Sequence, residues 1–416
     1  MKILYITCEI PKFPGGGGGQ TKQFNMLRQL SKRHEVDLIC PRITGELLET
    51  LKKVCHRVIM PDITLLGKFA PRWMLWFLVK IKKGLELLMS VMSEHPEYVQ
   101  RTFWHKVLMM PIVKRELKSG AYDIIQLEHT NIAHWLKGVR ILIPKVIVAH
   151  NVKSVLYLRY WKNATDGKKS LMQREYLRFL KFERDNLPQY DCVVAMSETD
   201  KGFIRQLYGE NIPVTIVQNG VDTDYYQITR HPAELVFVGT MNYEPNDEAA
   251  LYFCDKIFPL ILEKNPSVNF SIVGKDPTID VLRLARNKNI TVTGFVPDSR
   301  PYMTDASVIV VPLLSGSGTR LKILEAMAMG KAVVSTSIGA EGIDYIDGED
   351  ILIADTVQTF AQKVLRLLSY PDEALKIGEN ARRLVEQKYA WEILLDKMDD
   401  AYSSAVTNAN NLNVKN

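Results

Sequence analysis

Cysteine is scarce in this chain, and the few cysteines are not spaced as a metal site or a disulfide framework requires. Five occur among 416 residues, at positions 8, 40, 55, 192 and 254. An odd number of scattered cysteines without a CxxC pair indicates reduced thiols and excludes the common zinc modules. We therefore predict no metal site. Cys8 and Cys40 end apolar runs, so we expect both side chains to lie in the core.

Long apolar runs are also lacking. No stretch reaches the roughly 18 to 20 consecutive apolar residues that a membrane-spanning helix needs. The chain starts directly with the strand-like run KILYIT, without the charged segment and long apolar segment of a secretory signal. We expect a cytoplasmic protein, and we interpret the triplet Asn163-Ala164-Thr165 as a chance match to the glycosylation motif.

A large excess of one charge is the third absence. The 53 basic and 47 acidic residues leave a formal net charge of +6, which argues against nucleic acid as a partner. The local exception is a helical insertion at about residues 62–118. Its basic residues, densest between 68 and 118, are interleaved with tryptophan and phenylalanine. This pattern is typical of an amphipathic helix pair at an anionic membrane surface, or of a pair whose apolar side packs on its own domain. Liposome flotation, with Lys80, Lys82 and Lys83 neutralised in a variant, distinguishes the two.

What the chain does have is length and alternation. With 46% hydrophobic residues it can bury two cores, so we expect two domains. Short β-branched runs alternate with helical segments, which indicates parallel sheets. In the first half we expect strands at residues 2–7, 36–40, 124–127, 145–149, 192–196 and 214–217. We also expect helices at residues 21–33 and 169–186, and a third helix with Ser197 as its N-cap.

A polar segment at residues 223–234 separates this series from a second one. In the second half we expect strands at residues 235–238, 268–273, 290–293, 307–311 and 351–353, and helices at 246–263, 360–368 and 372–388. A last helix at 389–402 precedes a polar tail, 403–416, that we expect to be disordered. The predicted fold class is α/β, with two Rossmann-like doubly wound domains, residues 1–228 and 229–388.

The stretch 306–342 combines a strand, a glycine loop, a helix and another strand. Gly316 and Gly318 lie in the loop, and the helix is predicted over residues 319–329. Such a loop directs backbone N–H groups and the positive end of a helix toward an anion. Arg320 and Lys322 stand in the first helical turn, where cations oppose the helix dipole. They therefore indicate an anionic ligand such as a phosphate.

A second glycine loop follows the first strand. Residues 15–19 are five consecutive glycines at the carboxyl end of that strand, where doubly wound sheets bind ligands. Gly16 and Gly17 are therefore candidates for ligand contact. A flexible connector explains the run equally well, because any glycine run satisfies a GxGxxG pattern.

Five segments, in order over nearly the whole chain, resemble the group 1 glycosyltransferases, a family of the GT-B fold described as retaining and as using nucleotide-sugar donors. They are PKFPGGGGGQTKQFNMLRQLSKRHEVDLI, IVAHNVKSVLYLRY, VQNGVDTDYY, LVFVGTMNYEPNDEAALYF and PLLSGSGTRLKILEAMAMGKAVVST. Tyr389-Ala390-Trp391 also resembles the start of the family's C-terminal helix, which crosses back onto the first domain. The resemblance implies that the second domain holds the donor nucleotide, in a cleft between the domains.

The resemblance also implies roles for single residues. The family glutamate that matches Glu325 meets ribose hydroxyls, and a carboxylate can accept two such hydrogen bonds. Arg320 and Lys322 would neutralise the diphosphate as it leaves, and loop glycines would let the backbone approach it. The predicted donor-binding residues are Gly16, Gly17, Gly239, Gly316, Ser317, Gly318, Thr319 and Glu325, and the predicted catalytic residues are His150, Arg320 and Lys322. The alternatives are that Glu325 is a solvated helix carboxylate and that Arg320 and Lys322 are surface cations without a ligand.

The chain departs from the family pattern at two places. Ser317 stands where many members have a second glutamate, eight positions before the residue that matches Glu325. Residues 239–242, Gly-Thr-Met-Asn, stand where many members have a basic pair. We infer that Arg320 and Lys322 take over the phosphate-binding charge from that loop. The residue that contacts the sugar in place of the missing glutamate is not identified by the sequence.

His150 ends a strand and matches a family histidine beside the reacting sugar. It would orient a sugar hydroxyl or stabilise an oxocarbenium ion through its backbone carbonyl, and a structural role is the alternative. Glu128-His129 could reach the acceptor, while Glu341 could touch the donor or serve as a plain turn residue. In the family's retaining transfer the departing phosphate assists deprotonation of the acceptor, so no protein nucleophile is needed.

We therefore predict a glycosyltransferase that moves a sugar from a UDP- or GDP-sugar to a glycan or lipid-linked acceptor. The resemblance implies retention and a place in bacterial cell-surface or exopolysaccharide synthesis. The donor is a substrate, and no cofactor is required. Two alternatives stay open, a nucleotide-sugar epimerase of the same architecture and a non-catalytic nucleotide-sugar-binding protein.

Overall fold

The computed structural model describes residues 1–61, 96, 102–139, 141–164, 166–228, 234–316 and 319–415. The chain divides into two compact units. The first unit comprises Met1–Lys12, Gln23–Val217 and Lys397–Asn416, and the second comprises Phe13–Lys22 and Gln218–Asp396. The division therefore differs from the expected boundary at residues 228/229. It assigns the glycine loop after the first strand to the second unit and most of the last helix to the first.

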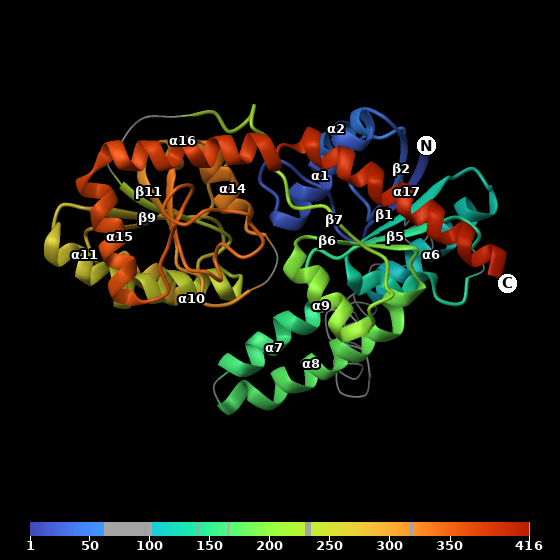
Figure 1. Cartoon of the computed structure of the whole chain (residues 1–416), viewed down its shortest axis with the longest axis horizontal. Coiled ribbons are helices and arrows are strands. Elements are labelled where there is room, and N and C mark those ends of the chain that lie inside the picture. Colours follow the sequence, from blue (N-terminus) through green and yellow to red (C-terminus); the bar gives the residue numbers. More distant parts are fainter. Residues whose placement is uncertain are drawn as a thin grey trace, which may run out of the picture. The chain divides into compact units, whose positions relative to one another are not determined.

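The first unit contains a parallel sheet of seven strands in the order β3-β2-β1-β4-β5-β6-β7 (Figure 1). The strands are β1 (Lys2–Ile6), β2 (Glu35–Ile39), β3 (Arg57–Ile59), β4 (Ile124–Glu128), β5 (Lys145–Val148), β6 (Cys192–Ala195) and β7 (Val214–Ile216). All six strands predicted for this half are confirmed within one or two residues. The edge strand β3 was missed because it has three partly exposed residues, too few to show an alternating pattern.

In the part of the first half that the structure describes, the helices are α1 (Gly18–Leu30), α2 (Glu46–Val54), α6 (Phe103–Lys118), α7 (Lys153–Asn163), α8 (Asp166–Asn186) and α9 (Glu198–Tyr208), with 3-10 turns η1 (Thr130–Leu136) and η2 (Leu187–Gln189). Ser197 caps α9 as predicted, because its hydroxyl accepts from the Asp200 N–H at 3.1 Å. The helices α2 and α7 were not predicted. Figure 1 shows α7 and α8 side by side as a hairpin.

The second unit contains a parallel sheet of six strands in the order β10-β9-β8-β11-β12-β13. They are β8 (Glu234–Val238), β9 (Asn269–Val273), β10 (Ile290–Val292), β11 (Ala306–Val311), β12 (Ala332–Ser335) and β13 (Leu352–Ile353). In both sheets the first strand of the series lies beside the fourth, which is the doubly wound order. The predicted α/β fold of two Rossmann-like sheets is confirmed.

The helices of the second half are α10 (Glu244–Tyr252), η3 (Phe253–Ile257), α11 (Phe258–Lys264), α12 (Ile279–Leu284), α13 (Arg300–Thr304), α14 (Leu321–Ala328), α15 (Val357–Ser369), α16 (Pro371–Lys388) and α17 (Trp391–Lys415). The single helix predicted over residues 246–263 contains a π-helical turn, η3. Pro259, in the first turn of α11, has no N–H to donate, which accounts for a widened turn at this point.

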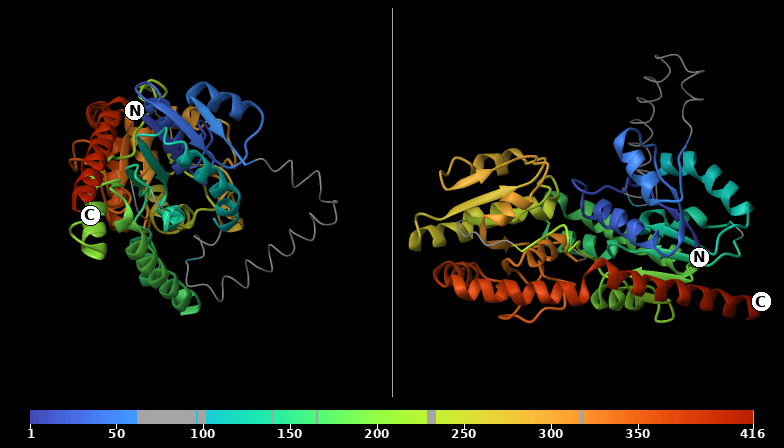
Figure 2. Two further views of the ribbon diagram at one scale, coloured as in Figure 1. Left: turned by 90° about the vertical axis from the view of Figure 1, so that its right-hand side faces the viewer. Right: turned by 90° about the horizontal axis from the view of Figure 1, so that it is seen from above.

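The last helix corrects a prediction. α17 is continuous to Lys415, so the expectation of a disordered tail at residues 403–416 was wrong (Figure 2). Ala405 and Ala409 are buried, and the Asn408 side chain donates to the carbonyl of Asp191 at 3.0 Å. Small buried residues at helical spacing anchor this polar segment to the first unit, which its composition did not reveal.

Each unit has its own apolar core, formed around its sheet. Cys8 and Cys40 are buried as predicted, and all five thiols are free. Among the described residues no helix is long and apolar enough to cross a membrane. Most of the basic, aromatic insertion lies outside the described residues, so contact with a membrane surface stays a prediction.

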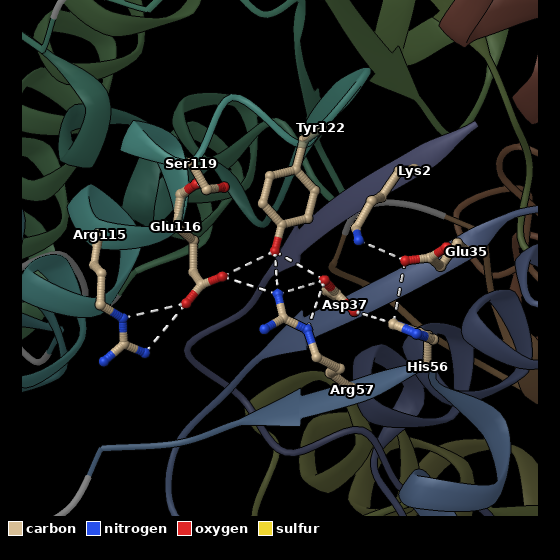
Figure 3. Close-up of polar contacts among 9 residues, drawn as sticks. All are labelled: Lys2, Glu35, Asp37, His56, Arg57, Arg115, Glu116, Ser119 and Tyr122. Carbon is tan, nitrogen blue, oxygen red and sulfur yellow. Dashed lines mark hydrogen bonds and ion pairs between the residues drawn. The ribbon is translucent and has the colours of Figure 1, made fainter.

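A charged network ties β2 and β3 to α6 in the first unit (Figure 3). The buried carboxylate of Asp37 accepts from the Arg57 guanidinium at 2.7 Å and from the Tyr122 hydroxyl at 2.8 Å. Arg57 also donates to Glu116 at 2.9 Å. The side chains of His56, Glu35 and Asp37 lie close enough to hold a metal ion together. However, Lys2 already contacts the Glu35 carboxylate and Arg57 contacts that of Asp37. We interpret the network as an ion-pair brace.

Candidate functional site

The stretch around α14 has the predicted order of strand, loop, helix and strand, but α14 starts at Leu321, so the prediction that Arg320 lies in the first helical turn was wrong. β11 ends at Val311, a loop follows, and Arg320 is the residue before α14, with an extended backbone (φ −85°, ψ 104°). Gly316 has φ 119°, a conformation that favours glycine. A Cβ there would also lie 2.6 Å from Nη2 of Arg320. Gly316 and Arg320 are thus brought together, whereas Ser317 and Gly318 lie outside the described residues.

The Lys322 side chain extends from α14 to residues of β8 and α10. Its Nζ donates to Oδ1 of Asn246 at 2.7 Å and lies 4.2 Å from the centroid of the Phe237 ring. Burial lowers the pKa of Lys322 to about 7, and repulsion from Arg320 adds to this, while the charge of Glu325 opposes it. The charge of Arg320 therefore disfavours the charged form of Lys322. A bound anion would relieve that repulsion.

Gly239, at the end of β8, makes room for this contact. A Cβ at position 239 would lie 2.7 Å from Nδ2 of Asn246 and 2.9 Å from Nζ of Lys322. The Asn246 amide also donates to the carbonyl of Thr240 at 2.9 Å, which fixes its oxygen toward Lys322. The structure thus brings Gly239 beside Lys322, and its role in donor binding stays a prediction. Asn246 was missed, and only its place in the segment LVFVGTMNYEPNDEAALYF pointed to it.

Glu325 lies one turn along α14 from Lys322. Burial raises the pKa of Glu325. A hydrogen bond from Tyr226 and attraction to Lys322 lower it, but burial has the larger effect. The neighbouring Tyr225 ring is covered by the guanidinium of Arg300 at 3.7 Å, and Asp298 binds that guanidinium at 2.7 Å. The two tyrosines occur in the segment VQNGVDTDYY, but sequence analysis assigned them no role. We call Tyr226, Gly239, Asn246, Gly316, Arg320, Lys322 and Glu325 the α14 cluster.

The turn before these tyrosines supports the cluster. Asn219 donates to the carbonyl of Thr319 at 2.9 Å, and the buried Thr319 hydroxyl donates to the carbonyl of Gly342 at 3.4 Å. A Cβ at Gly220 would lie 2.7 Å from the Trp391 ring, so only glycine fits there. Thr319, two residues before α14, is therefore held by hydrogen bonds to Asn219 and Gly342. Glu341 lies in a turn, where its N–H donates to the carbonyl of Ile338 at 3.4 Å.

The glycine run after β1 belongs to the second unit. A Cβ at Gly18 would lie 3.5 Å from the Leu321 side chain, and the Phe13 ring packs edge-on against Tyr225 at 4.8 Å. Gly17 precedes α1, and its N–H donates to Oε1 of Gln20 at 2.9 Å. The run therefore passes beside the start of α14. The role of Gly16 and Gly17 in donor binding stays a prediction.

A second group of polar side chains lies in the first unit, at the ends of β4 and β5. Nε2 of His150 lies 2.5 Å from Oε2 of Glu128, and the rings of His150 and His129 are stacked with centroids 4.0 Å apart. All three side chains are buried. His129 has φ 74°, an uncommon value for a residue with a side chain. The structure thus joins the two segments that the sequence proposed separately. We call these residues the β4–β5 cluster.

Comparison with known proteins gives a match in each half of the chain. A family model described as group 1 glycosyl transferases matches residues 232–370, and one described as glycosyltransferase family 4 matches residues 90–225. One of these two models thus matches each half of the chain. The chain is a glycosyltransferase, as predicted, and these matches support the predicted family.

Two curated proteins are similar to this glycosyltransferase. An uncharacterized 44.6 kDa protein of the cps region of Klebsiella pneumoniae is 24% identical over 93% of this chain and 96% of its own length. The capsular polysaccharide biosynthesis glycosyltransferase CapM of Staphylococcus aureus is 26% identical over 51% of this chain and 61% of its own length.

Solved structures show the same fold. Sucrose-phosphate synthase of Thermosynechococcus elongatus superposes with a TM-score of 0.71 at 17% identity, covering 97% of this chain and 98% of its own. TarM superposes with a TM-score of 0.68 at 14% identity, covering 96% of this chain and 98% of its own. The glycosyltransferase therefore has the GT-B architecture.

Proposed function

We propose that the second unit binds a nucleotide-sugar donor through the α14 cluster. The observation that carries this is the pair Arg320 and Lys322, held beside Gly316 and Gly239 at the carboxyl ends of β11 and β8. Backbone without Cβ atoms, two cations and the start of a helix suit a diphosphate. Glu325, one turn further, suits the ribose hydroxyls. Among proteins of the same fold, HepE of Anabaena is known in complex with UDP and glucose.

We propose further that the sugar passes to a glycan or lipid-linked acceptor with retention. In that step the bond between the sugar and the diphosphate breaks, and a bond to the acceptor oxygen forms. The diphosphate gains negative charge, which Arg320 and Lys322 stabilise, and it takes the proton of the acceptor hydroxyl. No residue of the described chain has to become a nucleophile. We propose that His150, in the β4–β5 cluster, contacts the reacting sugar.

The relatives support a role in surface polysaccharide synthesis. CapM is a capsular polysaccharide enzyme, and another relative, 24% identical over 36% of this chain, is a poly(ribitol-phosphate) alpha-N-acetylglucosaminyltransferase. We propose an acceptor of that general kind, a glycan or polyol-phosphate chain. We propose no particular sugar, because Ser317 replaces the glutamate that many family members carry, and a screen of sugar nucleotides identifies it.

A thermal-shift screen with UDP-, GDP-, ADP- and CMP-sugars tests the donor proposal. A ligand present at 100 times its Kd stabilises the folded protein by about 2.7 kcal/mol. We expect one nucleotide class to raise the melting temperature, and Arg320→Ala and Glu325→Ala to abolish that rise. Arg286→Ala, which changes an exposed arginine in the same unit, is the matched control. Equal shifts in wild type and both site variants would refute the site.

Release of nucleotide from the selected sugar nucleotide then separates transfer from binding alone. We expect slow hydrolysis without acceptor and faster turnover with a glycan or polyol-phosphate acceptor. A protein that binds the donor but releases nucleotide under neither condition would contradict the catalytic part of the proposal. The configuration of the product, read by NMR coupling at the anomeric carbon, tests retention.

A further inference from the structure

A row of buried polar side chains links the last helix to His150. The Tyr402 hydroxyl on α17 contacts Oε1 of Gln126 on β4. Nε2 of Gln126 donates to Oε1 of Glu128 at 2.5 Å, and Oε2 of Glu128 lies 2.5 Å from Nε2 of His150. Tyr402 and Gln126 are fully buried, Glu128 is 2% exposed and His150 is 9% exposed. All four residues belong to the first unit.

The backbone explains how the row is assembled. Gln126 and Glu128 are two residues apart on β4, so their side chains project from the same face of the sheet. Glu128 is paired in register with Val148 of the neighbouring strand β5, and His150 follows two residues later. The two strands therefore place Glu128 and His150 together. Tyr402 closes the row from a helix 276 positions away from Gln126.

The hydrogen bonds in the row run in one direction. A carboxylate only accepts, so Gln126 must turn its amide NH2 toward Glu128. The carbonyl oxygen of that amide then faces Tyr402, which must donate to it. By the same rule Nε2 of His150 must carry the hydrogen that Glu128 accepts. When the ring is neutral, its lone pair is then on Nδ1.

We propose that Tyr402 and Gln126 are positioning residues that act through Glu128 to hold His150 in one orientation and in the Nε2–H tautomer. This inference rests on the proposed function, in which His150 contacts the reacting sugar. The hydrogen bond from Nε2 to Glu128 fixes the orientation of the His150 ring. The last helix thereby contributes to the reaction without touching a substrate. In metal sites, outer partners that orient a ligating histidine typically affect activity about 10- to 100-fold, and we expect a comparable effect on His150.

The test uses Tyr402→Phe in the full-length enzyme. Tyr190→Phe is the matched control, because Tyr190 is equally buried in the same unit and its hydroxyl donates at 2.7 Å to a backbone carbonyl outside the row. We expect Tyr402→Phe to lower kcat about 10-fold or more with little change in donor KM. We expect Tyr190→Phe to keep the wild-type kcat at temperatures where both variants are folded.

A second readout does not depend on activity. In enzyme labelled with 15N-histidine, the His150 signals, assigned by their loss in His150→Gln, should show a single Nε2–H tautomer in wild type and Tyr190→Phe. A mixture of tautomers is expected in Tyr402→Phe and in Gln126→Leu. A wild-type tautomer and kcat in Tyr402→Phe would overturn the proposal. If no nucleotide sugar binds the wild type, the proposed function fails, while the tautomer measurement still decides whether the row orients His150.

Discussion

The Nζ atom of Lys322 lies 2.7 Å from Oδ1 of Asn246, across 76 positions of sequence. The contact joins α14 to the helix that follows β8, and Gly239 leaves room for it. In many family members the loop after the strand that matches β8 carries its own basic residues. In this chain Lys322 of α14 lies beside that loop, and Asn246 accepts a hydrogen bond from it. This arrangement is consistent with the inference that α14 supplies the phosphate-binding charge.

Binding of a nucleoside diphosphate should take up a proton above pH 7. Burial lowers the pKa of Lys322 to about 7, so its side chain is mostly neutral at pH 8 and mostly charged at pH 6. A diphosphate favours the charged form and raises this pKa. Calorimetry of UDP or GDP binding in two buffers of different ionisation enthalpy should show proton uptake at pH 8 and little at pH 6. Lys322→Met should remove the uptake, and uptake unchanged in that variant would contradict the assignment.

Asn246→Ala should weaken donor-nucleotide binding although Asn246 need not touch the ligand. Its amide orients Lys322, and a hydrogen bond to a charged group contributes about 1.5–3 kcal/mol. We expect the Kd for the nucleotide to rise roughly 10-fold, as measured by calorimetry at pH 7. Asn287→Ala, at an exposed position of the same unit, should leave the Kd unchanged. Equal affinities of the two variants would rule out the orienting role.

Gly239→Ala should impair binding and stability together. The added Cβ would meet Asn246 at 2.7 Å and Lys322 at 2.9 Å, so these side chains must move. Overpacking of this kind costs about 1–3 kcal/mol. Gly202→Ala is the control, because this helical glycine of α9 has open space around its Cβ position and should gain roughly 0.5–1 kcal/mol. Urea unfolding and nucleotide titration measure both effects, and a fully active, stable Gly239→Ala variant would refute this account.

Arg57→Ala should destabilise the first unit at neutral pH more than at acid pH. Burial alone would raise the pKa of Asp37 and of Glu116, but hydrogen bonds from Arg57 and other donors outweigh it and lower both. A lowered carboxyl pKa contributes stability above the unfolded value, near 4, that is lost as the pH falls. The variant leaves the buried Asp37 less compensated, so we expect a loss of about 2–4 kcal/mol at pH 7.

Urea unfolding at pH 7 and near pH 3.5 checks this expectation for Arg57. The difference between wild type and Arg57→Ala should shrink at the lower pH. Arg115→Ala is a control, because Arg115 contacts Glu116 from an exposed position and should matter by less than about 1 kcal/mol. A loss that is the same at both pH values would mean that charge does not hold the network together.

Much of the fold could be predicted from local patterns. Short β-branched runs such as Ala306–Val311 are typical of buried strands. Their alternation with helical segments indicates parallel sheets. The polar composition of the last residues misled the prediction, because Ala405 and Ala409 are small and their burial depends on what they meet. The edge strand β3 was too short to carry a pattern.

The sequence by itself determined two parallel α/β sheets and the glycines, cations and carboxylate around α14, because these depend on residue type and on spacing within one segment. Only the tertiary structure decided that Asn246 holds Lys322, and that Tyr402 reaches His150 through Gln126 and Glu128. Contacts between residues 76 or 276 positions apart arise from strand register and helix docking. No local periodicity encodes which side chains will then meet. For that reason the chemistry of α14 was visible in the sequence, and the residues that orient it were not.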